Sequence, residues 1–210
     1  MKTVNLNSQK IIKAGGQYYK ILIPKEEILL AIKKIAQEIH NKYCNSLEQI
    51  VLMPILRGGY ETYQNIAAEL TQLNFSFDTY EVQIGRYSDQ NNGHVPRMIK
   101  EPPDVTNRVV IFIDDLIDNG DSVKFLYNYL SARGTKSIEC CVLIAKIGHR
   151  PLNFTINYSG FRNVVRKWLG GFGMNIGPDD STRNFEDIYV KISKLEAWII
   201  QAYLWLRKIF

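Results

Sequence analysis

Three short apolar runs constrain the fold of this chain more than any other feature. They occupy residues 49–56, 108–113 and 137–145, and each is almost continuously Val, Ile, Leu or a similar side chain. Strands with such continuous runs are buried on both faces, as in parallel sheets covered by helices. The pattern predicts an α/β fold with a central, mostly parallel sheet flanked by helices, and ligands beyond the carboxyl ends of the strands.

Segments with helical spacing separate these runs. Residues 25–43 follow Pro24 and carry apolar side chains three and four positions apart, and residues 60–73 and 123–133 show the same periodicity, the last ending before Gly134. Residues 18–23 and 78–84 alternate as strands do. The expected order is therefore strand, helix, strand, helix, strand, and then the two later runs with a helix between them.

Two segments do not fit this alternation. Residues 85–104 are polar, contain Gly93, Pro96, Pro102 and Pro103, and are too long for a simple connection, so we expect a mobile functional loop. Residues 192–210 predict a helix with a broad apolar face. Packing on the domain or at a subunit interface is the favoured explanation of that face, and a membrane-surface helix with flanking basic residues is the alternative, although the polar face is thin.

Length and composition bound the domain count and the partners. The chain has 210 residues and 46% hydrophobic composition, which suits one domain, placed at 1–191, with an amphipathic helix at 192–210. A net charge of +5 suits anionic partners, whether nucleic acid, an acidic membrane or phosphorylated small molecules. The sequence contains no run of about 18 apolar residues, so no transmembrane segment is predicted. Three cysteines without an even framework and a polar N-terminus favour a cytoplasmic location.

The segment 109–122 has the strongest chemical character. A buried strand ends in Asp114 and Asp115, Asp118 follows three residues later, and the turn 119–122 leads into a helix. Adjacent carboxylates can bind ribose hydroxyls or hold Mg2+, which prefers oxygen ligands. The N-terminus of a helix favours phosphate through its N–H groups and dipole. A surface turn with a helix cap is the simplest alternative, whereas a calcium loop would need a later Glu and a P-loop would need Gly-Lys-Ser/Thr.

This segment resembles the phosphoribosyl pyrophosphate motif of the type I phosphoribosyltransferases. That motif is a hydrophobic run, two acids, two aliphatic residues, Asp, Thr-Gly, any residue, and Thr or Ser. The match runs from 109 to 122 and departs at Asn119, where the family usually has Thr, and it has Asp121 at the variable position. Gly120 and Ser122 fit. The resemblance implies the type I fold with a small hood, and it covers about residues 18–191.

Other segments resemble the hypoxanthine/guanine branch of this family. By that resemblance, Leu56, Arg57, Gly58 and Gly59 form the pyrophosphate loop, and Arg86 and Tyr87 begin the flexible hood that closes over the substrates. For the base, the resemblance implies that Lys146 reads the purine O6, Trp168 stacks on the ring and Leu169 offers backbone groups to its edge. It also implies that Arg183 binds pyrophosphate and that Asn175 lies near a second Mg2+, at a position where the branch usually has Asp.

The implied reaction joins a 6-oxopurine base to the ribose of phosphoribosyl pyrophosphate. Asp114 and Asp115 would serve the ribose and Mg2+, and Asp118 would be the general base. The resemblance also implies a homo-oligomer, a dimer or a tetramer, with no nucleic acid as partner. The alternatives are a nucleotide-sensing RNA-binding regulator, which the net positive charge would suit, and a degenerate ligand-binding member of the same fold.

Overall fold

The computed structural model describes residues 11–89, 93–146, 154–162, 167–176, 180 and 182–206. The chain forms two compact units. One combines Met1–Ile28 with Arg166–Phe210, and the other is Leu29–Val165. The boundary predicted at residue 191 stays a prediction.

The larger unit contains the predicted sheet. Its strands are β3 (Ile50–Leu56), β4 (Asp78–Thr79), β5 (Val82–Asp89), β6 (Gly93–Lys100), β7 (Val109–Ile117), β8 (Ser137–Ala145) and β9 (Ile156–Arg162). The order is β6-β5-β3-β7-β8-β9, with β4 also beside β3. Every pair is parallel except β5 with β6. The α/β fold with a mostly parallel sheet is confirmed.

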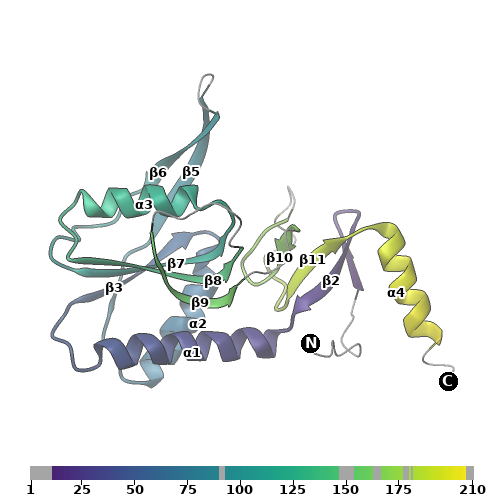
Figure 1. Cartoon of the computed structure of the whole chain (residues 1–210), viewed down its shortest axis with the longest axis horizontal. Coiled ribbons are helices and arrows are strands. Elements are labelled where there is room, and N and C mark those ends of the chain that lie inside the picture. The colour runs from purple at the N-terminus through teal and green to yellow at the C-terminus, as the bar shows by residue number, and fades with distance from the viewer. Residues whose placement is uncertain are drawn as a thin grey trace. The chain divides into compact units, whose positions relative to one another are not determined.

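Helices cover both faces of this sheet. Figure 1 shows α3 (Asp121–Ser131) above it and α1 (Lys25–Tyr43) and α2 (Gly59–Gln72) below it. Alternate residues of the central strands, such as Met53 and Phe112, pack with Leu126 of α3 in one buried cluster. The apolar runs are continuous because both faces of each strand are covered.

A buried carboxylate ties α1 to the sheet. Glu139 of β8 is 4% exposed and accepts hydrogen bonds from Lys42, from the Tyr43 hydroxyl (2.6 Å) and from the Tyr158 hydroxyl (2.6 Å). Burial pushes the pKa of Glu139 upward, but these donors together bring it below its ordinary value. The carboxylate therefore stays charged and joins α1, β8 and β9.

The smaller unit is an antiparallel sheet with a helix. Its strands are β1 (Ile11–Ala14), β2 (Gln17–Ile23), β10 (Leu169–Gly170) and β11 (Ile188–Ile192), in the order β1-β2-β11-β10. Helix α4 (Lys194–Leu206) packs on β2. The predicted extended segment at 18–23 and the predicted C-terminal helix are both present. Nothing in the periodicity had indicated β1, β10 or β11.

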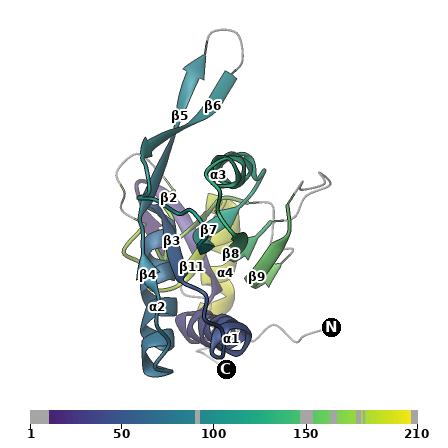
Figure 2. The same ribbon diagram turned by 90° about the vertical axis from the view of Figure 1, so that its left-hand side faces the viewer.

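The prediction of a loop at 85–104 is wrong. Strands β5 and β6 form an antiparallel hairpin there, with Gln83 opposite Lys100 and Asp89 opposite Gly93, and Figure 2 shows it projecting beyond the rest of the sheet. Its proline, Pro96, is tolerated because β6 is an edge strand. The polar composition is that of a ribbon with little to bury, not of irregular chain.

Strand β7 also extends further than expected. It continues through Asp114 and Asp115 to Ile117, so the two acids are part of the strand instead of the turn after it. The backbone pairs with β8 on both sides of Asp115, with Asp114 opposite Val142 and Leu116 opposite Ile144. Both acids are therefore held on regular secondary structure. Among the described residues, no helix is long and apolar enough to cross a membrane.

Candidate functional site

Asp114 and Asp115 lie at the carboxyl end of the central strand. Both side chains are half-buried, and the Asp115 N–H donates to Asp114 Oδ1 at 3.0 Å. Since β3, β7 and β8 are parallel, the ends of all three strands meet at the same edge. Two carboxylates at this edge form an oxygen-rich surface suited to hydroxyl groups or a hard cation.

The turn between β3 and α2 lies directly against these acids. A Cβ atom added to Gly58 would come within 2.1 Å of Asp115 Oδ2, and one added to Gly59 would come within 2.4 Å of the Ile113 carbonyl oxygen. The predicted loop of Leu56, Arg57 and Gly58 and the predicted acids are thus brought together. The two glycines permit this approach because they have no side chain.

The turn after β7 leads into α3 through Gly120, whose φ of 78° is left-handed. Asp118, Asn119 and Asp121 are exposed. Asn119 Nδ2 donates to Asp121 Oδ2 at 2.5 Å, and the Asp121 N–H donates to Asn119 Oδ1 at 3.3 Å. The two residues at which the motif is unusual are therefore bonded to each other. Ser122 follows in the first turn of α3, where helical N–H groups favour an anion.

Lys146 lies beside this turn, just beyond β8. Its N–H donates to the Ile117 carbonyl at 2.9 Å, and the residue is 7% exposed. Burial lowers the pKa of Lys146, while the negative charge of Asp118 acts in the opposite direction. The structure thus brings Lys146 and Asp118 close enough to interact. A largely buried ammonium group at the strand ends can donate to an acceptor on a bound ligand.

The smaller unit carries the remaining predicted side chains. Trp168 is 73% exposed and hence not a core residue, while Leu169 is buried in β10. Arg183 donates from Nε to Asp180 Oδ1 (2.9 Å) and from Nη1 to the Gly173 carbonyl (2.6 Å), which fixes its guanidinium. Asn175 Oδ1 accepts from Thr182 Oγ1 at 3.2 Å.

Thr182 had not been recognised in the sequence. Its side chain is buried; the hydroxyl donates to Asn175 Oδ1 and accepts from the Ile176 N–H at 2.8 Å. It positions the amide of Asn175, and no local sequence pattern marks such a threonine. Arg86 and Tyr87 have backbone in β5, but their side chains lie outside the described part of the chain.

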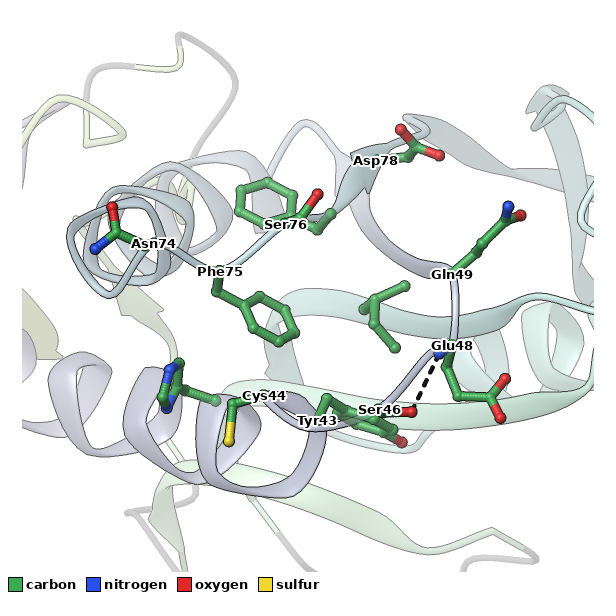
Figure 3. Close-up of a pocket in the computed structure, with 12 residues that line it drawn as sticks. Tyr43, Cys44, Ser46, Glu48, Gln49, Asn74, Phe75, Ser76 and Asp78 are labelled. Atoms are coloured by element: carbon green, nitrogen blue, oxygen red, sulfur yellow. Dashed lines mark hydrogen bonds between the residues drawn. The ribbon is translucent and has the colours of Figure 1, made fainter.

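A cavity of about 380 Å3 lies at the opposite edge of the larger sheet, where β3 begins. Figure 3 shows Tyr43 and Cys44 from the end of α1, Phe75 and Asp78 from the segment before and into β4, and the Glu48 N–H donating to Ser46 Oγ. None of the residues predicted to bind substrate lines this cavity. The acidic edge of β7, not this cavity, is the candidate site.

Comparison with known proteins agrees with this geometry. Residues 19–176 match the family model of the phosphoribosyl transferase domain. Among curated relatives, the hypoxanthine-guanine phosphoribosyltransferase of Aquifex aeolicus (strain VF5) is 26% identical over 83% of this chain and 96% of its own. The hypoxanthine phosphoribosyltransferase of Escherichia coli (strain K12) is 24% identical over 74% of this chain and 86% of its own.

A solved structure shows the same fold. The hypoxanthine phosphoribosyltransferase of Staphylococcus aureus superposes with a TM-score of 0.74 at 18% identity, covering 93% of this chain and 98% of that one. The mostly parallel sheet, covered by helices and ending in two carboxylates on β7, defines an α/β protein. The chain belongs to the phosphoribosyl transferase family, and the type I fold inferred from the motif is confirmed.

Proposed function

We propose that this protein transfers the 5-phosphoribosyl group of phosphoribosyl pyrophosphate to hypoxanthine or guanine, giving a nucleoside monophosphate and pyrophosphate. The observation that carries the proposal is the edge where Asp114 and Asp115 lie against the Gly58 turn and beside the N-terminus of α3. The names of the curated relatives support the choice of base. The proposed activity belongs to purine salvage, and we propose the cytoplasm as its location.

The sugar diphosphate would bind across the ends of β3 and β7. Asp114 and Asp115 bind the ribose hydroxyls, Arg57 takes charge on the departing pyrophosphate, and Ser122 with the first turn of α3 receives the 5′-phosphate. Gly58 leaves room for Asp115 to approach that loop. Holding both substrates in line lowers the barrier, since little covalent help from the protein is needed.

Mg2+ fits the same carboxylates. Among the described residues there is no group of three or more His, Cys, Asp or Glu able to form a cage, but magnesium is commonly held by one or two carboxylates with substrate phosphates and water. Asp114 and Asp115 would hold it, with Asn175 as a proposed neutral ligand at a second position. When bound, the ion neutralises charge on the pyrophosphate.

Asp118 is proposed to accept the proton that the purine loses at N7 as its ring nitrogen attacks the anomeric carbon. Lys146 would donate to the exocyclic O6, Trp168 would stack on the base and Leu169 would offer backbone groups to its edge. Arg183 is proposed to bind pyrophosphate, and Arg86 and Tyr87 to begin the closing hairpin. A homo-oligomer, dimer or tetramer, stays a prediction that light scattering would check.

The test is an assay of pyrophosphate release with phosphoribosyl pyrophosphate, Mg2+ and a panel of bases. We expect turnover with hypoxanthine and guanine, and the matching nucleoside monophosphate as second product. An adenine rate equal to these would remove the assigned role of Lys146. Absence of turnover with every purine, together with saturable binding of the sugar diphosphate, would instead indicate a ligand-binding member of the fold.

A further inference from the structure

The outward face of α4 is an apolar surface that the proposed transferase site leaves unused. This helix lies outside residues 19–176, the range matched by the family model. Trp198 is 66% exposed, Leu195 65% and Trp205 63%. Bulky apolar side chains exposed together on one element mark an interaction surface, whereas single exposed ones do not.

These side chains form one continuous stripe. At 100° per residue, seven positions fall on a single side of the helix. They are Leu195, Trp198, Ile199, Ala202, Tyr203, Trp205 and Leu206. The opposite side contains Ala197, which is 1% exposed, and the half-buried Ile200 and Leu204, so it is the side that packs within the unit. The helix thus keeps its fold contacts while presenting an uncharged face.

The charges around this stripe are nearly all positive. Lys191 and Lys194 are exposed at the start of the helix, and the sequence after it adds Arg207 and Lys208. Glu196 is the one acid in residues 188–210. The Glu196 carboxylate already has two partners, because it pairs with Lys167 at 3.2 Å and accepts a hydrogen bond from the Ser193 N–H at 2.8 Å.

This distribution decides between two occupants. A second copy of α4 would bring basic helix ends toward one another and would offer no acid to balance them. An anionic lipid surface would satisfy both features, because Trp and Tyr favour the level of the lipid headgroups and Lys and Arg are attracted to acidic lipids. At 13 residues the helix is about 20 Å long, too short to span a hydrocarbon core of about 30 Å. It can only lie along a membrane.

We propose that the apolar face of α4 docks the protein on anionic lipid membranes, with the helix lying in the plane of the interface. Docking of this kind combines burial of apolar side chains with electrostatic attraction. It uses none of the residues assigned to substrate. The proposal therefore stands or falls separately from the transferase activity.

The test is co-sedimentation of the full chain with vesicles. One set is phosphatidylcholine alone, and the other contains about one-third phosphatidylglycerol. We expect binding to the anionic vesicles to be at least about 30-fold tighter than to the neutral ones, which is the contribution of Lys191 and Lys194 alone, and to weaken as salt is added. Equal binding to both sets, or no binding to either, would overturn the proposal.

Two pairs of variants locate the binding surface. Trp198→Gln with Trp205→Gln should weaken binding at least about a hundredfold, whereas Leu30→Gln with Leu47→Gln, which removes exposed leucines elsewhere, should leave it unchanged. Thermal unfolding followed by circular dichroism shows that each variant is folded. Retained binding in the tryptophan variant would refute the assignment of α4.

Charge and self-association complete the experiment. Lys191→Gln with Lys194→Gln should reduce the preference for anionic vesicles by about 30-fold, while Lys33→Gln with Lys34→Gln removes the same charge from α1 and should not. Equal losses from both pairs would mean that net charge alone drives binding, against the proposal. Light scattering that shows a dimer converted to monomer by the tryptophan variant, without vesicle binding by the parent, would assign the face to a second copy.

Discussion

Gly58 offers the sharpest test of how the strand ends are assembled. Its φ of −59° and ψ of −50° are helical values that alanine adopts without strain, so Gly58→Ala acts only through the added methyl group. That Cβ would lie 2.1 Å from Asp115 Oδ2, where ordinary contact begins at 3.4 Å. The carboxylate must therefore recede by about 1.3 Å. A misplacement of about 1 Å at a reacting centre can cost roughly a hundredfold in rate.

The stability cost should be small, because the obstructing atoms belong to the end of a side chain. Moving Asp115 off its preferred rotamer costs about 0.5–1.5 kcal/mol. Gly59→Ala is the matched contrast, since its Cβ would meet the Ile113 carbonyl oxygen of the β7 backbone at 2.4 Å. Overpacking against backbone costs about 1–3 kcal/mol, or roughly 2–12 °C in Tm for a chain of this size.

The assay measures kcat/KM for the sugar diphosphate and Tm for both glycine variants and for Asp115→Ala. We expect Gly58→Ala to lose activity with little change in Tm, and Gly59→Ala to lose Tm. The double variant Gly58→Ala with Asp115→Ala should be no worse than Asp115→Ala alone, because the side chain that the methyl displaces is gone. Additive losses, or unchanged kinetics in Gly58→Ala, would refute the reasoning.

Three further outcomes are expected. Asp118→Asn should lower turnover by about a hundredfold with little change in KM for the sugar diphosphate. Asp115→Asn should instead weaken sugar-diphosphate or Mg2+ binding, and its rate should recover partly with added metal. If the two variants behave alike in a Mg2+ titration, the separate roles assigned to Asp118 and Asp115 are wrong. Lys146→Met should reduce the preference for hypoxanthine over adenine by about tenfold to a hundredfold, measured as a ratio of kcat/KM, since a buried unmatched donor costs about 1–3 kcal/mol. Glu139→Gln should lower the free energy of unfolding by about 2 kcal/mol at pH 7 through loss of the charged acceptor. Because the pKa of Glu139 is depressed in the folded chain, the stabilisation by its carboxylate is present above the ordinary carboxyl pKa and is lost as pH falls through the folded pKa. The free energies of unfolding of the parent and the variant should therefore converge in acid denaturation.

The parallel core was predictable because burial on both faces leaves a direct mark on the sequence. Continuous apolar runs with helical segments between them predicted β3, β7 and β8, and the motif resemblance predicted which strand end carries the acids. The contact between the Gly58 turn and Asp115 follows from parallel neighbours whose ends meet at one edge. To predict that contact one must know that β3 and β7 are neighbours in the sheet, and the periodicity of the sequence does not reveal the order of the strands.

The antiparallel parts were less visible for a physical reason. Hairpin β5–β6 has little apolar surface to bury, so its polar residues and Pro96 look like loop residues, and only cross-strand pairing reveals the ribbon. Strand β10 has two residues and pairs with β11 about twenty positions later. Such strands are stabilised by partners distant in sequence, and no local signal specifies them.

The two unusual residues of the motif, Asn119 and Asp121, form one hydrogen-bonded unit. An aspartate at 121 beside a phosphate would repel it, but Asn119 accepts the Asp121 N–H and donates to its carboxylate, which ties that side chain to the turn. The same bonds occupy one N–H of the first turn of α3, so the donors offered to a 5′-phosphate begin at Ser122. Asp114, Asp115 and Asp118 retain their motif positions. The unusual pair thus alters the phosphate end of the proposed site, where it should tune affinity for the sugar diphosphate, and leaves the carboxylates around the anomeric carbon unchanged.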